Sequence, residues 1–179
     1  MILGLDFYNF VLDYAQQFEN VTFLQETITG IDAEAAAAVV RTSENSYTAR
    51  YVFNSTQVFN PKITEQNSLL QHFKGWVIQS EKPVFNPKVG RLMDFSVSQK
   101  QGATFMYVLP TSTTKALVEY TLFSPRVLEK ETYVTALKKY IKEDLKIDNY
   151  TIEHEEFGVI PMSLAKFEKT SKPNVINLG

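Results

Sequence analysis

The hydrophobic pattern of the first third of the chain predicts one amphipathic helix followed by short strands. Residues 5–18 place apolar side chains at i, i+4, i+7 and i+11, the period of a helix with one apolar face. The β-branched and aromatic run over 21–28 predicts a strand. Residues 35–56 predict a hairpin about the polar turn "TSENS", although the four alanines at its start also favour a helix. Residues 59–68, which contain Pro61 and have no apolar period, predict a loop and a domain boundary.

Strand patterns dominate the second half of the chain until one strong helix. We expect strands over 69–80, 91–99, 103–110 and 115–124, and the last two flank the turn "TSTT" as a hairpin. Residues 126–147 predict a helix, and its apolar stripe consists of Val134, Leu137, Ile141 and Leu145. The last two predicted strands are 149–162 and 173–179. This order is typical of an α+β fold with a mostly antiparallel or mixed sheet and two main helices.

Composition and charge exclude several classes of function. The chain has 179 residues, 44% apolar and 21% charged, with a net charge of −2, so it lacks the basic footprint of a nucleic-acid-binding protein. The absence of cysteine excludes disulfides and thiolate metal sites, and two histidines are few for a histidine-based metal site. The chain starts without a signal-peptide pattern, and its longest apolar run, "AAAAVV", is far shorter than the roughly 20 residues of a membrane span. We therefore expect a cytoplasmic protein.

Both ends of the sequence resemble truncation points within a longer chain. The chain enters a helix almost at once, and "NVINLG" is an apolar strand that stops at Gly179, a typical opening of a glycine-rich phosphate turn. We expect an internal fragment of a longer protein. The alternative is a short terminus docked in a sheet.

The strand 115–124 contains one carboxylate whose role the pattern leaves open. Alternation places Glu119 on one face with Leu117 and Thr121, whereas Tyr120 points to the other face. Because an unpaired glutamate is almost never buried, the plain interpretation of Glu119 is a solvent-facing residue. The alternative is a proton donor in an apolar pocket.

Other polar and aromatic residues have a structural and a functional interpretation. Asp94 is either a turn or edge-strand aspartate bonded to backbone, or part of a site. Glu155 and Glu156 fit a solvated rim better than a site. His72 fits a structural role, and Trp76 fits the core better than a ligand contact. Four lysines of the helix predicted over 126–147 form a solvent-exposed face or, alternatively, contact an anionic membrane surface. They are Lys138, Lys139, Lys142 and Lys146.

Three segments together resemble the flavin-dependent lycopene cyclases of carotenoid-making bacteria. They are "LLQHFKGWVIQSEKPVFNP", "LMDFSVSQKQGATFMYVLPTSTTKALVEYTLFS" and "EEFGVIPM", all within 69–162. The order of Met93-Asp94, Leu109-Pro110, the Ser/Thr turn and Glu119-Tyr120-Thr121 carries the resemblance. It extends less specifically over the whole chain, where "NVINLG" is similar to the first half of a second flavin-contacting motif.

The resemblance implies a fold, a cofactor and a site. It implies the substrate-domain part of a p-hydroxybenzoate-hydroxylase-like FAD fold, with 1–60 as a partial FAD-domain segment, 61–165 as the substrate-binding sheet and helix, and 166–179 as the returning FAD-domain strand. It implies reduced FAD as cofactor and lycopene or a related carotene as substrate, and a substrate that resides in lipid would suit the alternative of peripheral membrane contact. The implied catalytic residues are Glu119 as general acid and Asp94 as supporting carboxylate. The other implied contacts are Trp76, Phe105, Tyr107, Tyr120, Pro161 and Met162 with substrate, and Gly179 with the cofactor.

The implied reaction is an isomerisation without net redox change. A proton adds to the terminal alkene, a neighbouring alkene attacks the cation, and the new ring loses a proton; a desolvated carboxyl with a raised pKa suits the first step. The sequence departs from the family in lacking the GxGxxG unit and the carboxy-terminal substrate helices, and in having Tyr120 where a second acid often follows the glutamate. We therefore expect the isolated chain to be inactive.

Two alternatives from other classes remain. One is a non-enzymatic carrier of a carotenoid or another apolar ligand. The other is a different flavoprotein of the same fold, such as a hydroxylase or a geranylgeranyl reductase, which the order "LMDF…YVLP…VEYT" disfavours.

Overall fold

The computed structural model describes residues 4–34, 36–56, 66–164 and 168–178. The chain divides into two compact units. Unit 1 combines 1–61 with 166–179, and unit 2 is the continuous segment 62–165. Each unit is described by itself.

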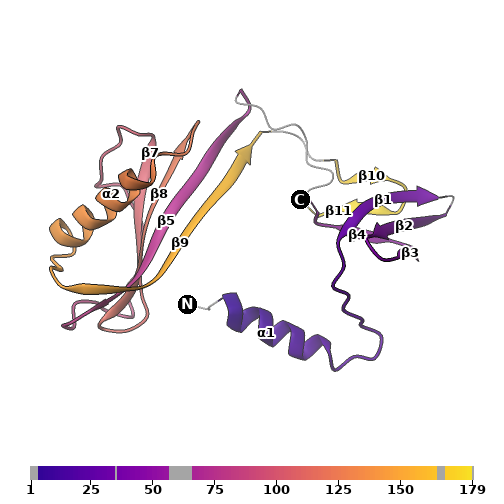
Figure 1. The fold of residues 1–179 in the computed structure, drawn as a ribbon, viewed down its shortest axis with the longest axis horizontal. Helices are drawn as coiled ribbons and strands as arrows, with labels where there is room; N and C mark the ends of the chain where they lie inside the picture. Colours follow the sequence, from indigo (N-terminus) through magenta and orange to yellow (C-terminus); the bar gives the residue numbers. More distant parts are fainter. Residues whose placement is uncertain (1–3, 35, 57–65, 165–167, 179) are drawn as a thin grey trace. The chain divides into compact units, whose positions relative to one another are not determined.

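Unit 2 is built on one five-stranded antiparallel sheet with the order β6-β7-β8-β5-β9 (Figure 1). One helix, α2, follows β8 and lies along one face of this sheet (Figure 1). The bounds are β5 Ser68–Ser80, β6 Arg91–Asp94, β7 Ala103–Pro110, β8 Lys115–Ser124, α2 Lys130–Glu143 and β9 Tyr150–Ser163.

The core of unit 2 lies between α2 and the sheet. Alternate residues of β8, such as Val118 and Leu122, are fully buried there, and α2 buries Leu137 and Ile141 against them. Full burial of such a side chain stabilises the fold by about 1.5–3 kcal/mol relative to its exposure. The same alternation sends the other half of each strand to the opposite face, which no described helix of unit 2 covers. We call the two sides the helix face and the open face.

Unit 1 holds two small sheets and the helix α1. One sheet has the order β1-β2-β3, and the other has the order β10-β11-β4, in which β11 runs parallel to β4. Its small core consists of Ile31, Ala38 and Val175, with Val40 and Val52 packed against them. The bounds are α1 Gly4–Ala15, β1 Ile28–Glu34, β2 Ala37–Thr42, β3 Ser46–Ala49, β4 Val52–Asn54, β10 Thr170–Lys172 and β11 Val175–Asn177.

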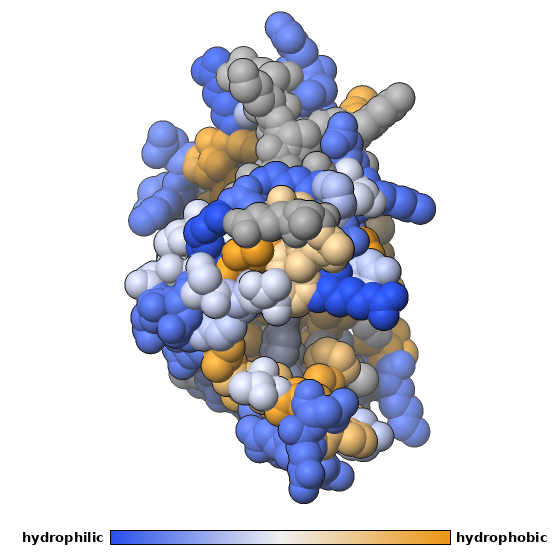
Figure 2. Space-filling model, turned by 90° about the vertical axis from the view of Figure 1, so that its right-hand side faces the viewer, coloured by the Kyte–Doolittle hydropathy of each residue, from blue (hydrophilic) through white to orange (hydrophobic). Residues whose placement is uncertain are grey.

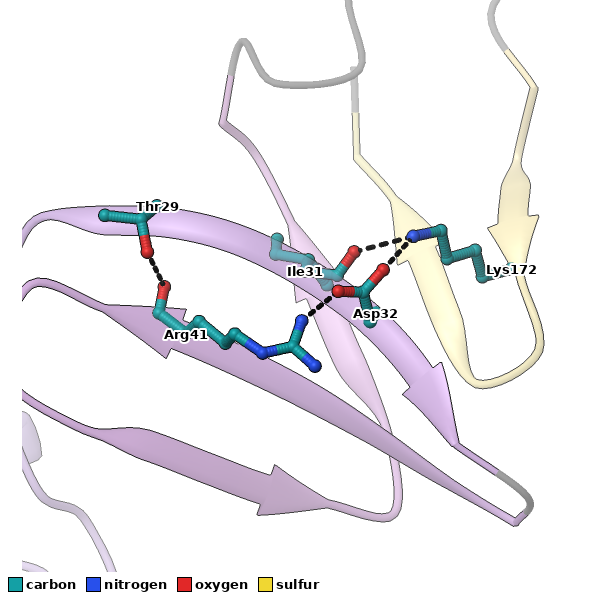
Figure 3. Close-up of polar contacts among 5 residues, drawn as sticks. All are labelled: Thr29, Ile31, Asp32, Arg41 and Lys172. Atoms are coloured by element: carbon teal, nitrogen blue, oxygen red, sulfur yellow. Dashed lines mark hydrogen bonds and ion pairs between the residues drawn. The ribbon is translucent and has the colours of Figure 1, made fainter.

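One carboxylate joins the two sheets of unit 1. Asp32 on β1 forms ion pairs with Arg41 on β2 and with Lys172 on β10, and the Lys172 ammonium also donates to the carbonyl oxygen of Ile31 at 3.0 Å (Figure 3). These contacts hold the pKa of Asp32 below its usual value, first through Lys172 and then through Arg41. The ion pairs tie a segment near residue 30 to one beyond residue 170.

The α+β fold class predicted from the sequence is confirmed: the described residues form mostly antiparallel sheets and two helices. The strand predicted over 21–28 is wrong, since 21–27 pairs with no strand and β1 begins at Ile28. Within the described residues, the alanine run forms no helix, and β2 takes its last two residues.

The surface is mixed in character. On the face shown in Figure 2, apolar side chains lie between polar ones rather than in one continuous patch. No helix in the described part of the chain is long and apolar enough to cross a membrane.

Candidate functional site

Strand β8 presents Glu119 on the open face. Its neighbours Val118 and Tyr120 point into the core under α2, so alternation directs Glu119 to the other side. In the antiparallel register, Glu119 lies opposite Tyr107 on β7 and opposite Gly75 on β5. Glu119 is partly buried there, in the middle strand of the sheet.

A second carboxyl reaches Glu119 from β9. Gly75 pairs with Glu119 on one side and with Glu156 on the other, so the two glutamates are separated by one residue that has no side chain. A Cβ placed on Gly75 would lie 2.8 Å from Oε1 and 2.9 Å from Cγ of Glu156. The Glu156 side chain therefore occupies the space above Gly75 and hydrogen-bonds to Glu119.

Burial raises the pKa of Glu119 to about 7, and its contact with Glu156 adds to the increase. The Thr121 hydroxyl opposes this shift, because it donates a hydrogen bond to Glu119 Oε1 at 2.6 Å. A carboxyl with this pKa holds its proton in a large share of molecules near neutral pH. It can therefore act as a general acid, which an ordinary surface glutamate cannot.

The open face around the two carboxyls is aromatic and apolar. The ring of Phe105 lies 5.2 Å from that of Tyr107, 5.4 Å from that of Phe95 and 6.2 Å from that of Phe123, measured between centroids. On the β9 side, the ring of Phe73 covers Gly158 so closely that a Cβ there would lie 2.4 Å from Cζ. Such ring faces favour an apolar ligand and can stabilise a cation.

One end of the open face is hollowed. A cavity of about 480 Å³ lies where β5 and β9 meet the end of β8. Its lining residues are Gln66, Asn67, Ser68, Leu69, Phe123, Met162, Ser163 and Leu164.

The predicted substrate contacts divide between the two faces. Phe105 and Tyr107 lie beside Glu119 on the open face, and Met162 lines the cavity on the same face. Trp76 and Tyr120 are 2% and 5% exposed, and both belong to the core on the helix face. Two further predicted contacts remain: Pro161 is exposed and alternates away from Met162, and Gly179 lies outside the described residues.

The structure does not bring Asp94 to Glu119. Asp94 pairs in register with Met106 of the core, and its carboxylate accepts a hydrogen bond from the Tyr140 hydroxyl on α2 at 2.6 Å. Its other oxygen accepts from the Ser96 backbone N–H at 3.0 Å, and Arg91 lies 3.5 Å away. The bonds to Ser96 and Tyr140 lower the pKa of Asp94 to about 2, so it is an ionised carboxylate on the helix face.

His72 is buried in a closed hydrogen-bond chain on the helix face. Its Nδ1 lies 2.6 Å from the Tyr133 hydroxyl and its Nε2 lies 2.8 Å from the Ser124 hydroxyl. Tyr133 accepts from the Leu128 N–H, and Ser124 donates to the Arg126 carbonyl. These partners assign the proton to Nε2, and burial lowers the pKa of His72, so the ring is neutral and structural.

Sequence reasoning missed Glu156. It grouped Glu155 and Glu156 as one solvated rim, but the two alternate along β9 and reach different faces. Glu155 forms an ion pair with Lys74 at 2.5 Å, whereas Glu156 meets Glu119 over Gly75. The signal that could have found it is the combination of a glycine in β5 with a glutamate in β9, once the register of the two strands is known.

The sequence matches the model of one protein family. The family described as "Lycopene cyclase protein" matches residues 9–179, nearly the whole chain. The chain belongs to the lycopene cyclase family. This is an enzyme family, and Glu119, Glu156 and the aromatic residues of the open face all lie within its matched region. No curated protein matches the chain closely enough for comparison.

Solved structures share the fold at low identity. The halogenase PltM has a TM-score of 0.61 at 11% identity over 97% of this chain and 40% of its own, and it has also been solved in complex with phloroglucinol and FAD. A geranylgeranyl bacteriochlorophyll reductase-like protein from Thermoplasma acidophilum has a TM-score of 0.58 at 16% identity, over 85% of this chain and 40% of its own. Glycine oxidase from Geobacillus kaustophilus has a TM-score of 0.56 at 11% identity, over 84% and 41%. The chain thus spans about two fifths of the length of these proteins, and the likeness concerns the fold.

Proposed function

We propose that this chain is an internal part of a lycopene cyclase and that Glu119 is the acid that starts ring closure on lycopene or a related carotene. The family supports the carotene substrate. The observation that carries the proposal is a partly buried carboxyl whose pKa is raised to about 7, on an aromatic-lined face of the sheet. In this proposal unit 2 is the substrate-binding part, and the two segments of unit 1 belong to a flavin domain.

The proposed reaction begins with proton transfer from Glu119. The π electrons of the terminal alkene form a C–H bond with this proton and leave a tertiary carbocation. The neighbouring alkene attacks the cation and closes the ring, and loss of a ring proton restores a neutral hydrocarbon. No electron is gained or lost, so the reaction is an isomerisation. Phe105 and Tyr107 would offer ring faces to the cation.

Flavin fits the topology of unit 1 as far as the described residues extend. In open α/β sheets, ligands bind beyond the carboxyl ends of the parallel strands, and the parallel strands β4 and β11 end at Asn54 and Asn177. The two amides hydrogen-bond to each other at 3.0 Å and would hold one edge of the cofactor site, and Gly179, outside the described residues, stays a proposed cofactor contact. When bound, a reduced flavin would supply electron density for the reaction. Because these strand ends are only one edge of a flavin site, we expect the isolated 179 residues to be inactive.

An experiment on the complete enzyme tests the role of Glu119. The gene that includes this chain is expressed in a lycopene-accumulating bacterial host, and carotenes are separated by chromatography. We expect Glu119→Gln to lower the amount of cyclised product at least about 100-fold, since general acid catalysis contributes on the order of 10²–10⁴ in rate. Glu155→Gln is the matched control, because Glu155 lies on the other side of the same sheet in an ion pair with Lys74.

The outcomes separate the proposal from its alternatives. Cyclised product in Glu119→Gln at the parent level would remove Glu119 from the acid role. A parent enzyme that binds lycopene and never cyclises it would favour a carrier, and a reduced or hydroxylated carotene would favour another flavoprotein reaction. Because carotenes reside in lipid, the assay also includes a membrane fraction, and transient contact of the enzyme with that surface is part of the proposal.

A further inference from the structure

The role of Glu119 alone does not explain why residue 75, on the open face, is a glycine. Gly75 lies in the interior of the 13-residue strand β5, where glycine weakens a strand and often marks a close approach by another group. The approaching group here is the Glu156 side chain, whose Oε1 and Cγ fill the position that a Cβ would occupy. On the other side, Leu117 Cδ1 lies 3.1 Å from that position. Any other residue at 75 would therefore displace the carboxyl of Glu156.

Two carboxyls hydrogen-bonded to each other hold one proton between them. A hydrogen bond between two carboxyls needs one protonated member, because an ionised carboxylate only accepts. Two negative charges in contact also repel each other, so ionisation of both carboxyls is unfavourable. This repulsion is the physical basis of carboxyl dyads. Gly75 brings Glu119 and Glu156 into this relation from strands that are both its hydrogen-bonded neighbours.

We infer that Glu156 is a positioning residue that shares one proton with Glu119 above Gly75 and so keeps Glu119 in its proton-donating form. This inference rests on the proposed role of Glu119 and adds a second carboxyl from β9 to it. The sequence has Tyr120, whose side chain faces the core, directly after Glu119. The partner carboxyl comes instead from across the sheet.

The charged groups around the pair leave its shared proton in place. On the open face, β7 contributes Tyr107 and β8 contributes Lys115, whose ammonium is engaged by Glu153. Strand β9 contributes His154, one pleat away from Glu156. Lys74 on β5 pairs with Glu155 on the helix face. Among the described residues, the charged group that acts on Glu119 is thus Glu156.

The pair also accounts for the proton through the whole cycle. It starts with one proton and a net charge of −1. Transfer of that proton to the alkene leaves two carboxylates, with a total charge of −2, beside the new carbocation. Loss of the ring proton returns one proton to the pair and restores its initial state. The balance needs no oxidant, reductant or further acid.

The test uses the complete enzyme with lycopene in phospholipid vesicles and measures kcat/KM against pH. Activity needs protonated Glu119, so it declines above the pKa of that group. In Glu156→Gln the like charge is gone and an amide N–H can stabilise ionised Glu119, so the decline moves to lower pH by about one unit. The loss relative to the parent is then small near pH 5.5 and about tenfold near pH 8.

Two further variants isolate the geometry. Gly75→Ala changes neither carboxyl but displaces Glu156 from its place above the strand, and we expect the same shift of the pH profile. Glu155→Gln, on the opposite side of β9, leaves the profile unchanged. A Glu156→Gln profile that superimposes on that of the parent, or a loss of equal size at every pH, overturns the inference.

A readout independent of activity separates this inference from the proposed function. Infrared difference spectra of the complete protein, titrated between about pH 5 and pH 9, should show a protonated carboxyl band that disappears near pH 7 in the parent. The band should disappear at lower pH in Glu156→Gln and be absent in Glu119→Gln. If Glu119→Gln still cyclises lycopene, the proposed function fails while this titration still decides whether the pair exists. A band unaffected by Glu156→Gln rejects the pair.

Discussion

The helix face and the open face of the five-stranded sheet treat their ionisable side chains in opposite ways. On the helix face, Asp94 and His72 each have partners that suit one charge state: ionised for Asp94, neutral for His72. On the open face, Glu119 lies against another carboxyl, and its preferred charge state changes near neutral pH. Both faces come from the same strands by alternation of side chains.

The difference separates a face that is packed for stability from a face whose carboxyl suits the proposed chemistry. On the helix face, Asp94 and His72 both have hydrogen-bond partners, and leaving such a buried group unsatisfied costs about 1–3 kcal/mol. The open face keeps a carboxyl in a setting that raises the free energy of its charged form. Strain of this kind is typical of functional sites, where perturbed pKa values concentrate.

The largest expected effect comes from removing core volume on the helix face. Leu137 on α2 is fully buried, so Leu137→Ala should lower the free energy of unfolding by about 2–5 kcal/mol. Ile160 alternates to the open face and is 45% exposed, so Ile160→Ala should cost less than about 1 kcal/mol. Urea unfolding followed by the fluorescence of the single tryptophan, Trp76, measures both in unit 2. Equal losses would contradict the contrast between the faces.

A smaller effect with a defined pH dependence is expected at His72. Near pH 8, His72→Gln should cost about 1–3 kcal/mol, because Tyr133 and Ser124 lose a matched partner. Burial holds the pKa of His72 below its usual 6.5, so the unfolded chain takes up the proton first as the pH falls. The contribution of the neutral ring is complete above about pH 6.5 and is lost below it. Urea midpoints of parent and variant should therefore converge towards pH 5, and a gap of constant size would refute this account.

The smallest effect, of opposite sign, is expected at Glu119. The pKa of Glu119 is raised from 4.5 to about 7, so the folded chain holds the proton more tightly than the unfolded chain does. The resulting stabilisation is complete below about pH 4.5 and is lost as the pH rises through 7. Glu119→Gln should thus be more stable than the parent by about 1 kcal/mol near pH 8 and equal to it near pH 4.5. A variant less stable than the parent near pH 8 would show that Glu119 supports the fold.

Local patterns in the sequence predicted the elements of unit 2 well. The strand predicted over 115–124 is β8 with the same bounds, and the helix predicted over 126–147 contains α2. Their periods of two and 3.6 residues depend on short-range geometry, which the sequence displays directly. The strand predicted over 21–28 is wrong because a strand needs a pairing partner, and β1 pairs with β2 only from Ile28 onwards.

The site was predictable only where alternation was sufficient. Alternation places Glu119 opposite to Tyr120, but it does not say which side a helix will cover. The position of α2 decides which side is covered, and α2 packs on the side that carries Trp76 and Tyr120, so both belong to the core. The contact of Glu119 with Glu156 depends on the register of β5 with two other strands, which is a nonlocal property.

The parallel pairing of β4 with β11 has a consequence for how such chains diversify. Residues 52–54 and 175–177 are neighbours in one sheet, so everything between them is an insertion whose two ends leave and rejoin the same small scaffold. An insertion attached in this way can be exchanged or remodelled in evolution while the scaffold keeps its own hydrogen bonds. If 62–165 is the substrate-binding part, as proposed, chimeras that exchange this segment between relatives should exchange substrate preference.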